Sequence, residues 1–435
     1  MPVSVAIVGS GPAGFYTAAA LLKSGAEVSI DIIERLPAPY GLIRFGVAPD
    51  HAKTKNVQNA YARTAEDERV RYFGNVELGR DVSVAELREM YDAVVLATGA
   101  SVDRPLGIPG DDKAGIVGVA AFVGWYNGHP DFRDLDPPLD TPSVVVIGVG
   151  NVAVDVARVL TKTPAEMAAT DLTGYAAQAI HAAPVTDVHM VGRRGPAQAK
   201  FSNVELREMG HLENCAPVID PAAIREEVPG DVSPREARLI ERNLATLRAF
   251  AEIDPGRREK RVHFTFFASP VEVLGGARVE AVRFERTRVD EAGRAVGLGE
   301  YFEIPCGLVI PAIGYYSEPI DGVPFDTARG RARSKDGFIE DGLYCVGWIK
   351  RGPSGVIGSN KPDGDTAAEL ILEAFPRGAK PGRDGLEGLL AGRGVRVVDF
   401  EAWKRIDAAE TAAAAQGAPR AKLTRVEDML QVLGG

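Results

Sequence analysis

The feature that most constrains the fold is a strand-and-turn motif that occurs twice in the chain. The apolar run at residues 3–8 leads into a glycine-rich turn, GSGPAG, at residues 9–14. The run at residues 144–147 leads into a similar turn, GVGNVA, at residues 148–153. Short continuous apolar runs are typical of parallel strands buried on both faces, and a helical stretch follows each turn. The sequence therefore predicts an α/β protein with two Rossmann-like, three-layer dinucleotide-binding domains.

Two further apolar runs indicate how these domains follow one another along the chain. Residues 93–99 and residues 308–314 each end at a small-residue turn, and we interpret them as crossings between the domains. We predict a first domain from residues 1–104 and 315–435, with the second domain, residues 105–314, inserted into it. A chain of 435 residues is expected to hold two or three domains.

The first turn carries the dinucleotide fingerprint in full. Gly9 allows the tight turn, Gly11 lets the backbone approach a pyrophosphate, and Gly14 permits close packing of helix on strand. The pyrophosphate is expected at the helix N-terminus, where N–H groups and the helix dipole favour an anion. Glu34 ends the next apolar run, at the position where an acid binds ribose hydroxyls. These features together predict a dinucleotide site at residues 9–14.

The strand-like run after the second turn ends in basic residues, where the run after the first turn ends in an acid. Gly148 and Gly150 fill the first two positions, and Ala153 fills the third, where the fingerprint tolerates alanine. No acid ends the next strand-like run, and Arg193 and Arg194 stand there instead. Guanidinium groups bind a 2′-phosphate through charge-assisted hydrogen bonds, whereas a carboxylate would repel it. We therefore assign FAD to the first turn and NADP(H) to the second; the alternative for the two arginines is a solvated basic turn.

Composition excludes several other classes of protein. The three cysteines, Cys215, Cys306 and Cys345, form no Cys-x-x-Cys motif. This excludes a redox disulfide of the thioredoxin reductase type, a cysteine-ligated iron–sulfur cluster and a structural zinc site, and no metal site is predicted. The net charge of −10 argues against nucleic-acid binding. No apolar run approaches the roughly 20 residues that span a bilayer, so we expect no membrane insertion, no targeting segment and a cytoplasmic location.

Three segments resemble the adrenodoxin reductase family, which includes the bacterial ferredoxin–NADP reductases of mitochondrial type. They are residues 33–51, IERLPAPYGLIRFGVAPDH, residues 193–196 with 205–208, RRGP and ELRE, and residues 347–358, GWIKRGPSGVIG. The resemblance covers nearly the whole chain. It implies a ferredoxin–NADP(+) reductase, in which hydride passes from NADPH to FAD and single electrons pass on to a ferredoxin-type iron–sulfur protein.

The resemblance also implies which residues contact the cofactors. The residues implied for FAD are Ala13, Glu34, Leu42, Leu78, Trp348, Gly355, Val356 and Ile357. Those implied for NADP(H) are Val149, Gly150, Asn151, Val152, Arg193, Arg194, Glu205 and Gly355. His51 and Glu208 match a histidine and a glutamate that the family links to proton handling near the flavin. The alternatives are a core or capping histidine and a solvated helix face.

Two rival functions are compatible with the same features. One is another NADPH-dependent FAD reductase, of the glutamate synthase type or acting on quinones or dyes. The other is a flavin-bound redox sensor without catalytic turnover. A flavin suits a junction between a two-electron donor and a one-electron acceptor, and the protein then supplies orientation and electrostatics.

A ferredoxin partner needs a basic surface on this acidic chain, because ferredoxins are generally acidic. Arg235, Arg238 and Arg242 recur at helical spacing in the charged stretch at residues 217–260 of the predicted second domain, which we predict to be mostly helical. We take them as part of the docking surface. The alternative is an ordinary solvated helix, since Glu236 and Glu241 are interspersed with them.

Overall fold

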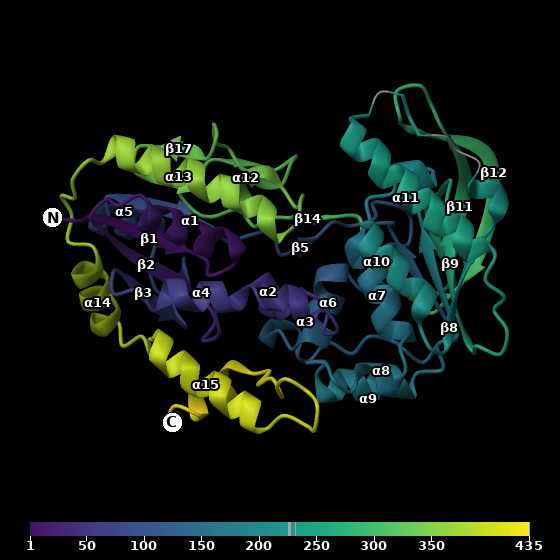
Figure 1. The fold of residues 1–435 in the computed structure, drawn as a ribbon, viewed down its shortest axis with the longest axis horizontal. Helices are drawn as coiled ribbons and strands as arrows, with labels where there is room; N and C mark the ends of the chain where they lie inside the picture. The colour runs from purple at the N-terminus through teal and green to yellow at the C-terminus, as the bar shows by residue number, and fades with distance from the viewer. Residues whose placement is uncertain (225–227, 231, 435) are drawn as a thin grey trace. The chain divides into compact units, whose positions relative to one another are not determined.

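The computed structural model describes residues 1–224, 228–230 and 232–434. The chain divides into two compact units, and the second is inserted into the first (Figure 1). The first unit comprises Met1–Val102, Asn127–Arg133 and Gly314–Gly435, and the second comprises Asp103–Tyr126 and Asp134–Ile313. Each unit is built around a mainly parallel sheet with helices, which confirms the predicted α/β class with two Rossmann-like folds.

The first unit has a six-stranded sheet in the order β17-β18-β4-β1-β2-β3, and only β17 is antiparallel to its neighbour. The strands are β1 (Val3–Val8), β2 (Val28–Glu34), β3 (Val70–Gly74), β4 (Ala93–Leu96), β17 (Phe338–Glu340) and β18 (Leu343–Cys345). All six residues of β1 are buried, as the continuous apolar run at residues 3–8 predicts. The sheet therefore needs a helical layer on each face.

Helices cover both faces of this sheet and make the three layers. The helices of the unit are α1 (Pro12–Lys23), α2 (Leu42–Phe45), α3 (Ala52–Lys55), α4 (Gln58–Ala65), α5 (Val84–Met90), α12 (Trp348–Arg351), α13 (Asn360–Ala374), α14 (Arg383–Gly392), α15 (Phe400–Ala412) and α16 (Val426–Gln431). Val5 and Ile7 of β1 share a core with α1, α13 and α15. Ala6 and Val8 face the opposite core, which includes buried residues of α5 and α14.

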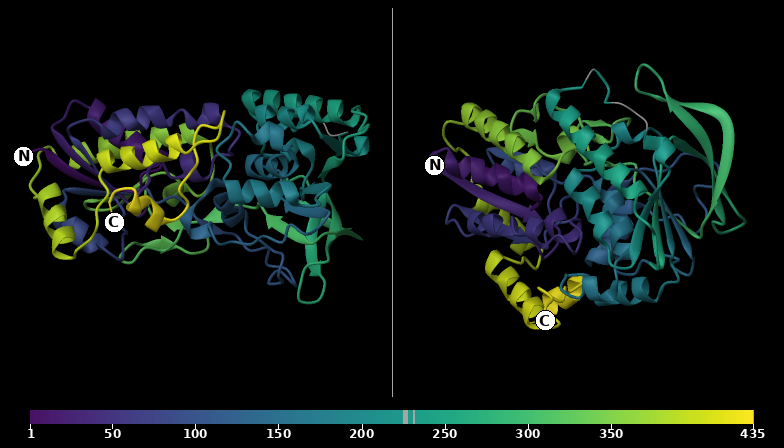
Figure 2. Two further views of the ribbon diagram at one scale, coloured as in Figure 1. Left: turned by 90° about the horizontal axis from the view of Figure 1, so that it is seen from below. Right: turned by 45° about the vertical axis from the view of Figure 1, so that its right-hand side comes forward.

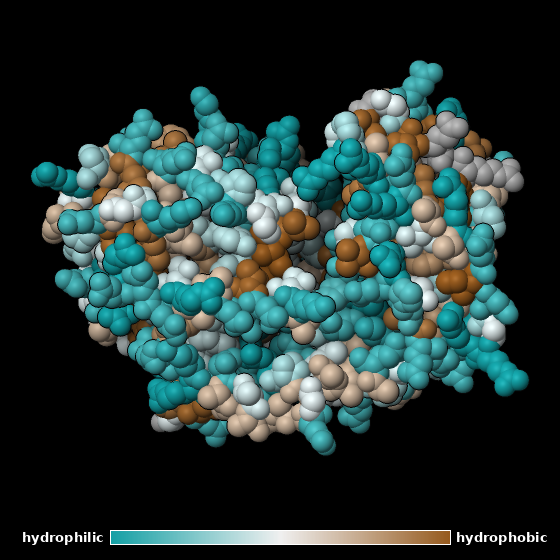
Figure 3. All heavy atoms as spheres, in the orientation of Figure 1, coloured by the Kyte–Doolittle hydropathy of each residue, from teal (hydrophilic) through white to brown (hydrophobic). Residues whose placement is uncertain are grey.

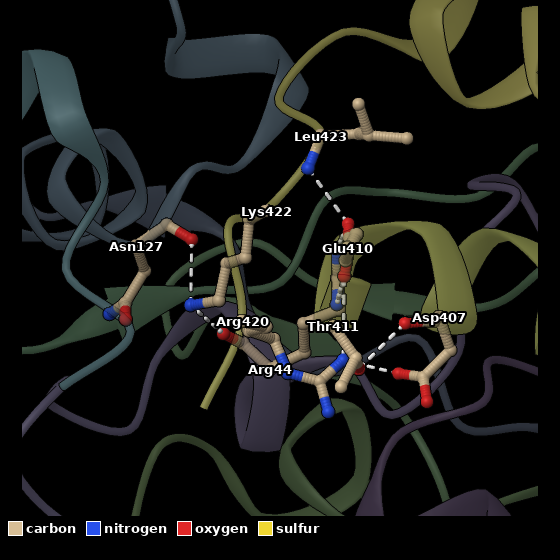
Figure 4. A network of polar contacts seen from close by, with 8 residues as sticks. All are labelled: Arg44, Asn127, Asp407, Glu410, Thr411, Arg420, Lys422 and Leu423. Atoms are coloured by element: carbon tan, nitrogen blue, oxygen red, sulfur yellow. Dashed lines mark hydrogen bonds and ion pairs between the residues drawn. The ribbon is translucent and has the colours of Figure 1, made fainter. Parts of the chain in front are cut away.

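The C-terminal segment is held within the first unit by a buried ion pair (Figure 4). Arg44 of α2 donates to both carboxylate oxygens of Glu410 on α15, at 2.9 and 2.5 Å, and the two side chains are 3% and 0% exposed. The Leu423 N–H donates to the same carboxylate at 2.8 Å. Lys422 Nζ donates to the carbonyl oxygens of Arg44 and Asn127, at 3.2 and 3.0 Å. These bonds tie the segment that begins at Asn127 to the first unit, although the predicted boundaries assign it to the second domain.

The second unit has a five-stranded, wholly parallel sheet in the order β13-β6-β7-β9-β8. Its strands are β6 (Ser143–Ile147), β7 (Asp187–Val191), β8 (Cys215–Ile219), β9 (Lys260–Thr265) and β13 (Leu308–Pro311). Its helices are α6 (Val119–Asn127), α7 (Asn151–Thr161), α8 (Pro164–Met167), α9 (Gly174–Ala182), α10 (Asn203–Glu208) and α11 (Pro234–Ala251). Helix α7 packs against β6, β7 and β9.

The other face of this sheet is covered by an antiparallel sheet that the sequence did not predict (Figure 2). Its strands are β10 (Ala268–Leu274), β11 (Ala281–Val289) and β12 (Ala295–Pro305). Val282 and Phe284 of β11 share a core with Val145 and Val309 of the parallel sheet. The charged stretch at residues 217–260, predicted to be mostly helical, contains one long helix, α11, and begins inside β8; residues 225–227 and 231 of it lie outside the described residues.

The face of the molecule in Figure 3 is mainly hydrophilic. Hydrophilic side chains cover most of the face seen in Figure 3, and apolar side chains form a few small groups among them. Within the described residues, no helix combines the length and the apolar character needed to cross a bilayer.

Candidate functional site

The first glycine turn, at residues 9–14, joins β1 to α1. Gly9 has φ +111°, and a Cβ at this position would lie 2.4 Å from the Ala97 carbonyl oxygen. A Cβ at Gly14 would lie 2.1 Å from the Gly9 carbonyl oxygen. Gly11 has φ −78°, which any residue adopts, and a Cβ here would meet no atom within 4 Å. Gly9 and Gly14 are therefore required by packing, whereas the space at Gly11 is what a pyrophosphate at the start of α1 needs.

Glu34 ends β2 beside this turn. Ser10 donates to Glu34 Oε2 from its N–H at 3.1 Å and from its hydroxyl at 2.6 Å. The Leu36 N–H donates to Glu34 Oε1 at 3.2 Å. The carboxylate is thus fixed next to the turn, as the fingerprint predicts for an acid that binds ribose hydroxyls.

The loop before α2 packs directly on the turn. The Tyr40 N–H donates to the Ser10 carbonyl oxygen at 3.1 Å, and Tyr40 itself has φ +84°. A Cβ at Gly41 would lie 3.0 Å from Gly11 Cα, so glycine allows the close approach. Leu42 then begins α2 with 42% of its surface exposed. A large exposed apolar side chain next to the proposed pyrophosphate site is consistent with a contact to FAD.

The segment from Gly347 to Gly355 reaches the same place from the C-terminal half of the unit. A Cβ at Gly347 would lie 2.6 Å from the Cβ of Ala13, in the first turn of α1. Trp348 follows, half-buried, and its Nε1 donates to the Ser354 carbonyl oxygen at 3.2 Å. Gly355 has φ +85°. The structure therefore brings Ala13 and the Trp348 segment together, as a common FAD site requires.

Asp363 of α13 braces this segment. It accepts hydrogen bonds from the Gly347 N–H at 3.1 Å and from Lys350 Nζ at 2.9 Å, and it forms an ion pair with Arg351. Val356 is 65% exposed, and its N–H donates to Ser359 Oγ at 3.0 Å.

Two more residues implied for FAD, Leu78 and Ile357, are partly buried in the first unit. Leu78, after β3, is partly buried against the core on the α5 and α14 side of the sheet. Ile357 is partly buried against the core on the α1 and α13 side.

The second glycine turn, at residues 148–153, repeats the geometry of the first. Gly148 has φ +144°, and a Cβ there would lie 2.3 Å from the Ala312 carbonyl oxygen. Gly150 has φ −115°, and a Cβ there would meet no atom within 4 Å. Ala153 is buried in the first turn of α7, after Val152. The backbone at Gly150 is thus open at the start of α7, where the NADP(H) pyrophosphate is predicted.

A neighbouring loop fixes this turn from the side. The Lys200 N–H donates to the Val149 carbonyl oxygen at 2.9 Å, and the Ser202 N–H donates to Asn151 Oδ1 at 2.6 Å. The hydroxyl of Ser202 caps α10 by accepting a hydrogen bond from the Glu205 N–H at 3.3 Å. The same loop therefore positions both the turn and Glu205.

A pocket of about 520 Å³ lies beyond β7 and is lined by Arg193, Arg194 and Arg294. Thr287 Oγ1 donates to the Arg193 carbonyl oxygen at 2.7 Å, and Arg194 Nη1 donates to the Gly293 carbonyl oxygen at 3.4 Å. The antiparallel sheet thus forms one wall. Arg193 and Arg194 provide donors of the kind that a 2′-phosphate needs. Arg294 also lines the pocket, although its guanidinium pairs with Asp290 at 3.0 Å, and Glu285 is the carboxylate of the lining. Arg294 was missed because it comes from the β11–β12 connection, and no local pattern in the sequence marks it.

Arg158 of α7 gathers three carboxylates in the second unit. Its side chain is 0% exposed, and it lies 2.8 Å from Asp155, 3.4 Å from Glu205 and 3.5 Å from Glu208. Glu205 and Glu208 are therefore held by a buried cation and are not a plain solvated helix face. His51 belongs to the first unit, where it is half-buried and directly precedes α3.

Comparison with known proteins places this geometry in a family. Residues 3–321 match the family described as pyridine nucleotide-disulphide oxidoreductase. The human mitochondrial NADPH:adrenodoxin oxidoreductase is 44% identical over 456 residues, which cover 99% of this chain and 92% of the human protein. The chain belongs to the adrenodoxin reductase family. The predicted resemblance is thereby confirmed.

A bacterial member of the adrenodoxin reductase family is similar over its full length. The NADPH-ferredoxin reductase FprA of Mycobacterium tuberculosis is 40% identical over 453 residues, which cover 99% of each protein. The solved structure of this FprA in complex with NADPH has a TM-score of 0.94 and 39% identity, and the match covers 100% of both chains.

The cysteines argue against disulfide chemistry in this member of the family. Cys215, Cys306 and Cys345 are free and buried. Burial raises the pKa of Cys215 to about 11 and the pKa of Cys306 to about 12. Since the thiolate is the reactive form, these thiols are inert near neutral pH.

Proposed function

We propose that this chain is a ferredoxin–NADP(+) reductase, an FAD enzyme that takes hydride from NADPH and passes single electrons to a ferredoxin-type iron–sulfur protein. The observation that carries the proposal is a pair of equivalent glycine turns, one followed by a negatively charged side chain and the other by positively charged ones. One turn is followed by a fixed carboxylate, Glu34, and the other by a pocket of three guanidinium groups. The names of the human and mycobacterial relatives support the same reaction.

The first unit supplies the FAD site. Gly11 leaves room for the pyrophosphate at the start of α1, Glu34 accepts hydrogen bonds from ribose, and Trp348 and Gly355 border the ring system. Bound FAD supplies the conversion between the two-electron chemistry of NADPH and the one-electron chemistry of an iron–sulfur protein. The protein's part is to orient the ring system and to exclude water from it.

The second unit binds and selects NADPH. Gly150 receives the pyrophosphate at the start of α7, and Asn151 and Val152 border it. Arg193, Arg194 and Arg294 bind the 2′-phosphate, which NADH lacks. Charge-assisted hydrogen bonds of this kind are roughly twice as strong as neutral ones.

Two residues are proposed to handle the proton that accompanies the hydride. His51 offers an imidazole nitrogen, a group that serves both as proton donor and as proton acceptor. Glu208 offers a carboxylate oxygen, which Arg158 Nε holds at 3.5 Å. These roles rest on the resemblance to the family and, for Glu208, on its ion pair with Arg158.

The function is tested with the purified protein under anaerobic conditions. We expect a yellow protein with one FAD per chain that NADPH bleaches and NADH bleaches far more slowly. Adding an oxidised ferredoxin should then restore the yellow colour and reduce the ferredoxin. Bound FAD that NADPH does not bleach would indicate a redox sensor. Bleaching followed by transfer to quinones or dyes, but not to any ferredoxin, would indicate another kind of reductase.

A further inference from the structure

A second basic pocket, of about 510 Å³, lies in the first unit and has no part in the cofactor sites described above. It is formed by the short hairpin of β15 (Phe325–Asp326) and β16 (Arg331–Ala332), the residues after β16, and the end of α12. Five cationic side chains line it: Arg329, Arg331, Arg333, Lys350 and Arg351. Asp326 and Asp336 are the carboxylates of the lining. Cations remain in excess even when Asp363, which binds Lys350 and Arg351, is counted.

The excess charge comes from β16 and the residues just after it. Within the described ranges, neither Arg331 nor Arg333 forms an ion pair, and Arg333 Nε donates to the Phe325 carbonyl oxygen at 3.0 Å. Arg329 is paired only loosely, 3.4 Å from Asp326, and its side chain is 70% exposed. On a chain of net charge −10, such a concentration of positive charge attracts an acidic partner locally.

The pocket is built on the same segment as the proposed flavin contacts. Lys350 and Arg351 end the helix that Trp348 begins, and Asp363 braces both cations to α13. A Cβ at Gly355 would lie 4.0 Å from Arg351 Nη2. A partner bound at this pocket therefore contacts the unit that holds FAD, close to the residues that border its ring system.

The lining suits carboxylates on a protein surface better than a nucleotide. Ala332 is the one apolar residue among the described residues that line the pocket, and it is buried, so the pocket offers charged and polar groups and no exposed apolar surface. Arginine forms bidentate, charge-assisted pairs with carboxylates.

We infer that the pocket lined by Arg329, Arg331 and Arg333 is a docking surface for the acidic ferredoxin, on the unit that delivers the electron. The inference rests on the proposed function and adds to it a surface separate from the predicted one on α11. Docking on the flavin-binding unit shortens the path from the cofactor to the iron–sulfur cluster. Electrostatic attraction at this surface should act mainly on the association rate.

The test is a double charge reversal, Arg331→Glu with Arg333→Glu, in the full-length flavoprotein. The matched control is Arg63→Glu with Arg405→Glu, on α4 and α15 of the same unit, because both residues are exposed and the change in net charge is the same. Ferredoxin binding to the oxidised protein is measured by calorimetry, and kcat/KM for ferredoxin is measured at low and high salt. Reduction of a small neutral dye by NADPH, together with FAD content, verifies folding and hydride transfer.

We expect the Arg331 and Arg333 variant to lose roughly tenfold or more in ferredoxin affinity and in kcat/KM at low salt. Its dye reduction should match that of the parent, and the control variant should stay close to the parent in every assay. Equal ferredoxin binding by the two double variants would overturn the inference. So would pyrophosphate binding that depends on these arginines while ferredoxin binding does not. A parent that binds ferredoxin through this surface but fails to reduce it would contradict the proposed reaction and leave the docking surface supported.

Discussion

Gly11 and Gly150 hold equivalent positions in the two glycine turns, and neither needs to be glycine for the sake of the fold. A Cβ at either position meets no protein atom within 4 Å, and both backbones lie in regions open to any residue. The function of each glycine is therefore to leave space for a ligand. This separates them from Gly9 and Gly148, whose positive φ and contact with a carbonyl oxygen demand glycine in the protein itself.

The first prediction rests on this difference. Gly11→Val should yield a folded protein that purifies without FAD, because the new side chain enters the space of the pyrophosphate from a position where a Cβ meets no protein atom within 4 Å. Gly150→Val is the matched control: it should retain FAD, and its KM for NADPH should rise at least tenfold. FAD content is measured from the absorbance of released flavin per protein. A full complement of FAD in the Gly11 variant would place the flavin elsewhere.

The second prediction concerns the three guanidinium groups of the second unit. Replacing Arg193 and Arg194 by alanine should raise the KM for NADPH at least tenfold, because a hydrogen bond to a charged group contributes about 1.5–3 kcal/mol. The KM for NADH should change little, since NADH has no 2′-phosphate. Arg294→Ala should act in the same direction. Steady-state kinetics with NADPH and with NADH measure both KM values. An equal rise in KM for the two cofactors would contradict the assignment of these arginines to the 2′-phosphate.

At the residue scale, site residues close to a motif in the chain could be predicted from the sequence, and site residues that reach the site from distant parts of the chain could not. Glu34 could be predicted because its distance from the glycine turn is set by one strand–helix–strand unit. Arg294 could not, because it reaches the pocket across the antiparallel sheet. Arg158 resembles an ordinary polar position of a helix, and only the folded unit shows that it is buried among carboxylates.

At the scale of elements, α2 is joined to α15 by the buried ion pair between Arg44 and Glu410. The pKa of Glu410 is raised by burial, but the charge and hydrogen bonds of Arg44 outweigh this effect, and the net pKa lies below the usual value. A carboxylate with a lowered folded-state pKa stabilises the fold fully above its unfolded pKa of about 4.3. That stability is lost as the pH falls through the folded-state value.

The third prediction uses this ion pair. Glu410→Ala should destabilise the protein by about 3–5 kcal/mol at pH 7, because Arg44 is left as an uncompensated buried charge. Asp407→Asn is the control, since Asp407 is 38% exposed and its pair with Arg420 contributes about 0–1 kcal/mol. Urea unfolding measures both free energies. The difference in unfolding free energy between the parent and the Glu410 variant should shrink below about pH 4. A difference that does not change with pH would show that the ion pair is not the source of this stability.

The strands of the antiparallel sheet were the elements that escaped prediction. The runs that became β1 and β6 are continuously apolar because both faces of a parallel strand are covered. In β12, four of the five residues from Leu298 to Phe302 are exposed. Its neighbour β11 is long and charged, and its buried positions alternate with partly buried or exposed ones. A sheet with one solvated face gives a weaker signal than a parallel core strand. The charged character of residues 217–260 indicates a mostly helical stretch, whereas α11 is the one long helix in the part of it that the structure describes.

At the scale of the whole molecule, charge is distributed unevenly. The net charge is −10, yet Arg235, Arg238 and Arg242 are all exposed on α11. Leu239 lies among them with 42% of its surface exposed. Basic side chains around an apolar one suit contact with an acidic protein, and Glu236 is engaged with Ser233 in the capping box of the helix.

The last prediction separates docking from hydride transfer. Raising the salt concentration should slow the reduction of ferredoxin and leave the reduction of a small neutral dye nearly unchanged, because the screening length falls to about 10 Å at 0.1 M salt. Charge reversal at Arg238 and Arg242 should lower kcat/KM for ferredoxin and flatten its dependence on salt, since steering acts on association. Dye reduction by NADPH is the control, because it needs both cofactor sites and no protein partner. Stopped-flow measurement of the association rate with ferredoxin decides the outcome: a rate equal to that of the parent at low salt would remove α11 from the docking surface, and the enzyme assignment would stand.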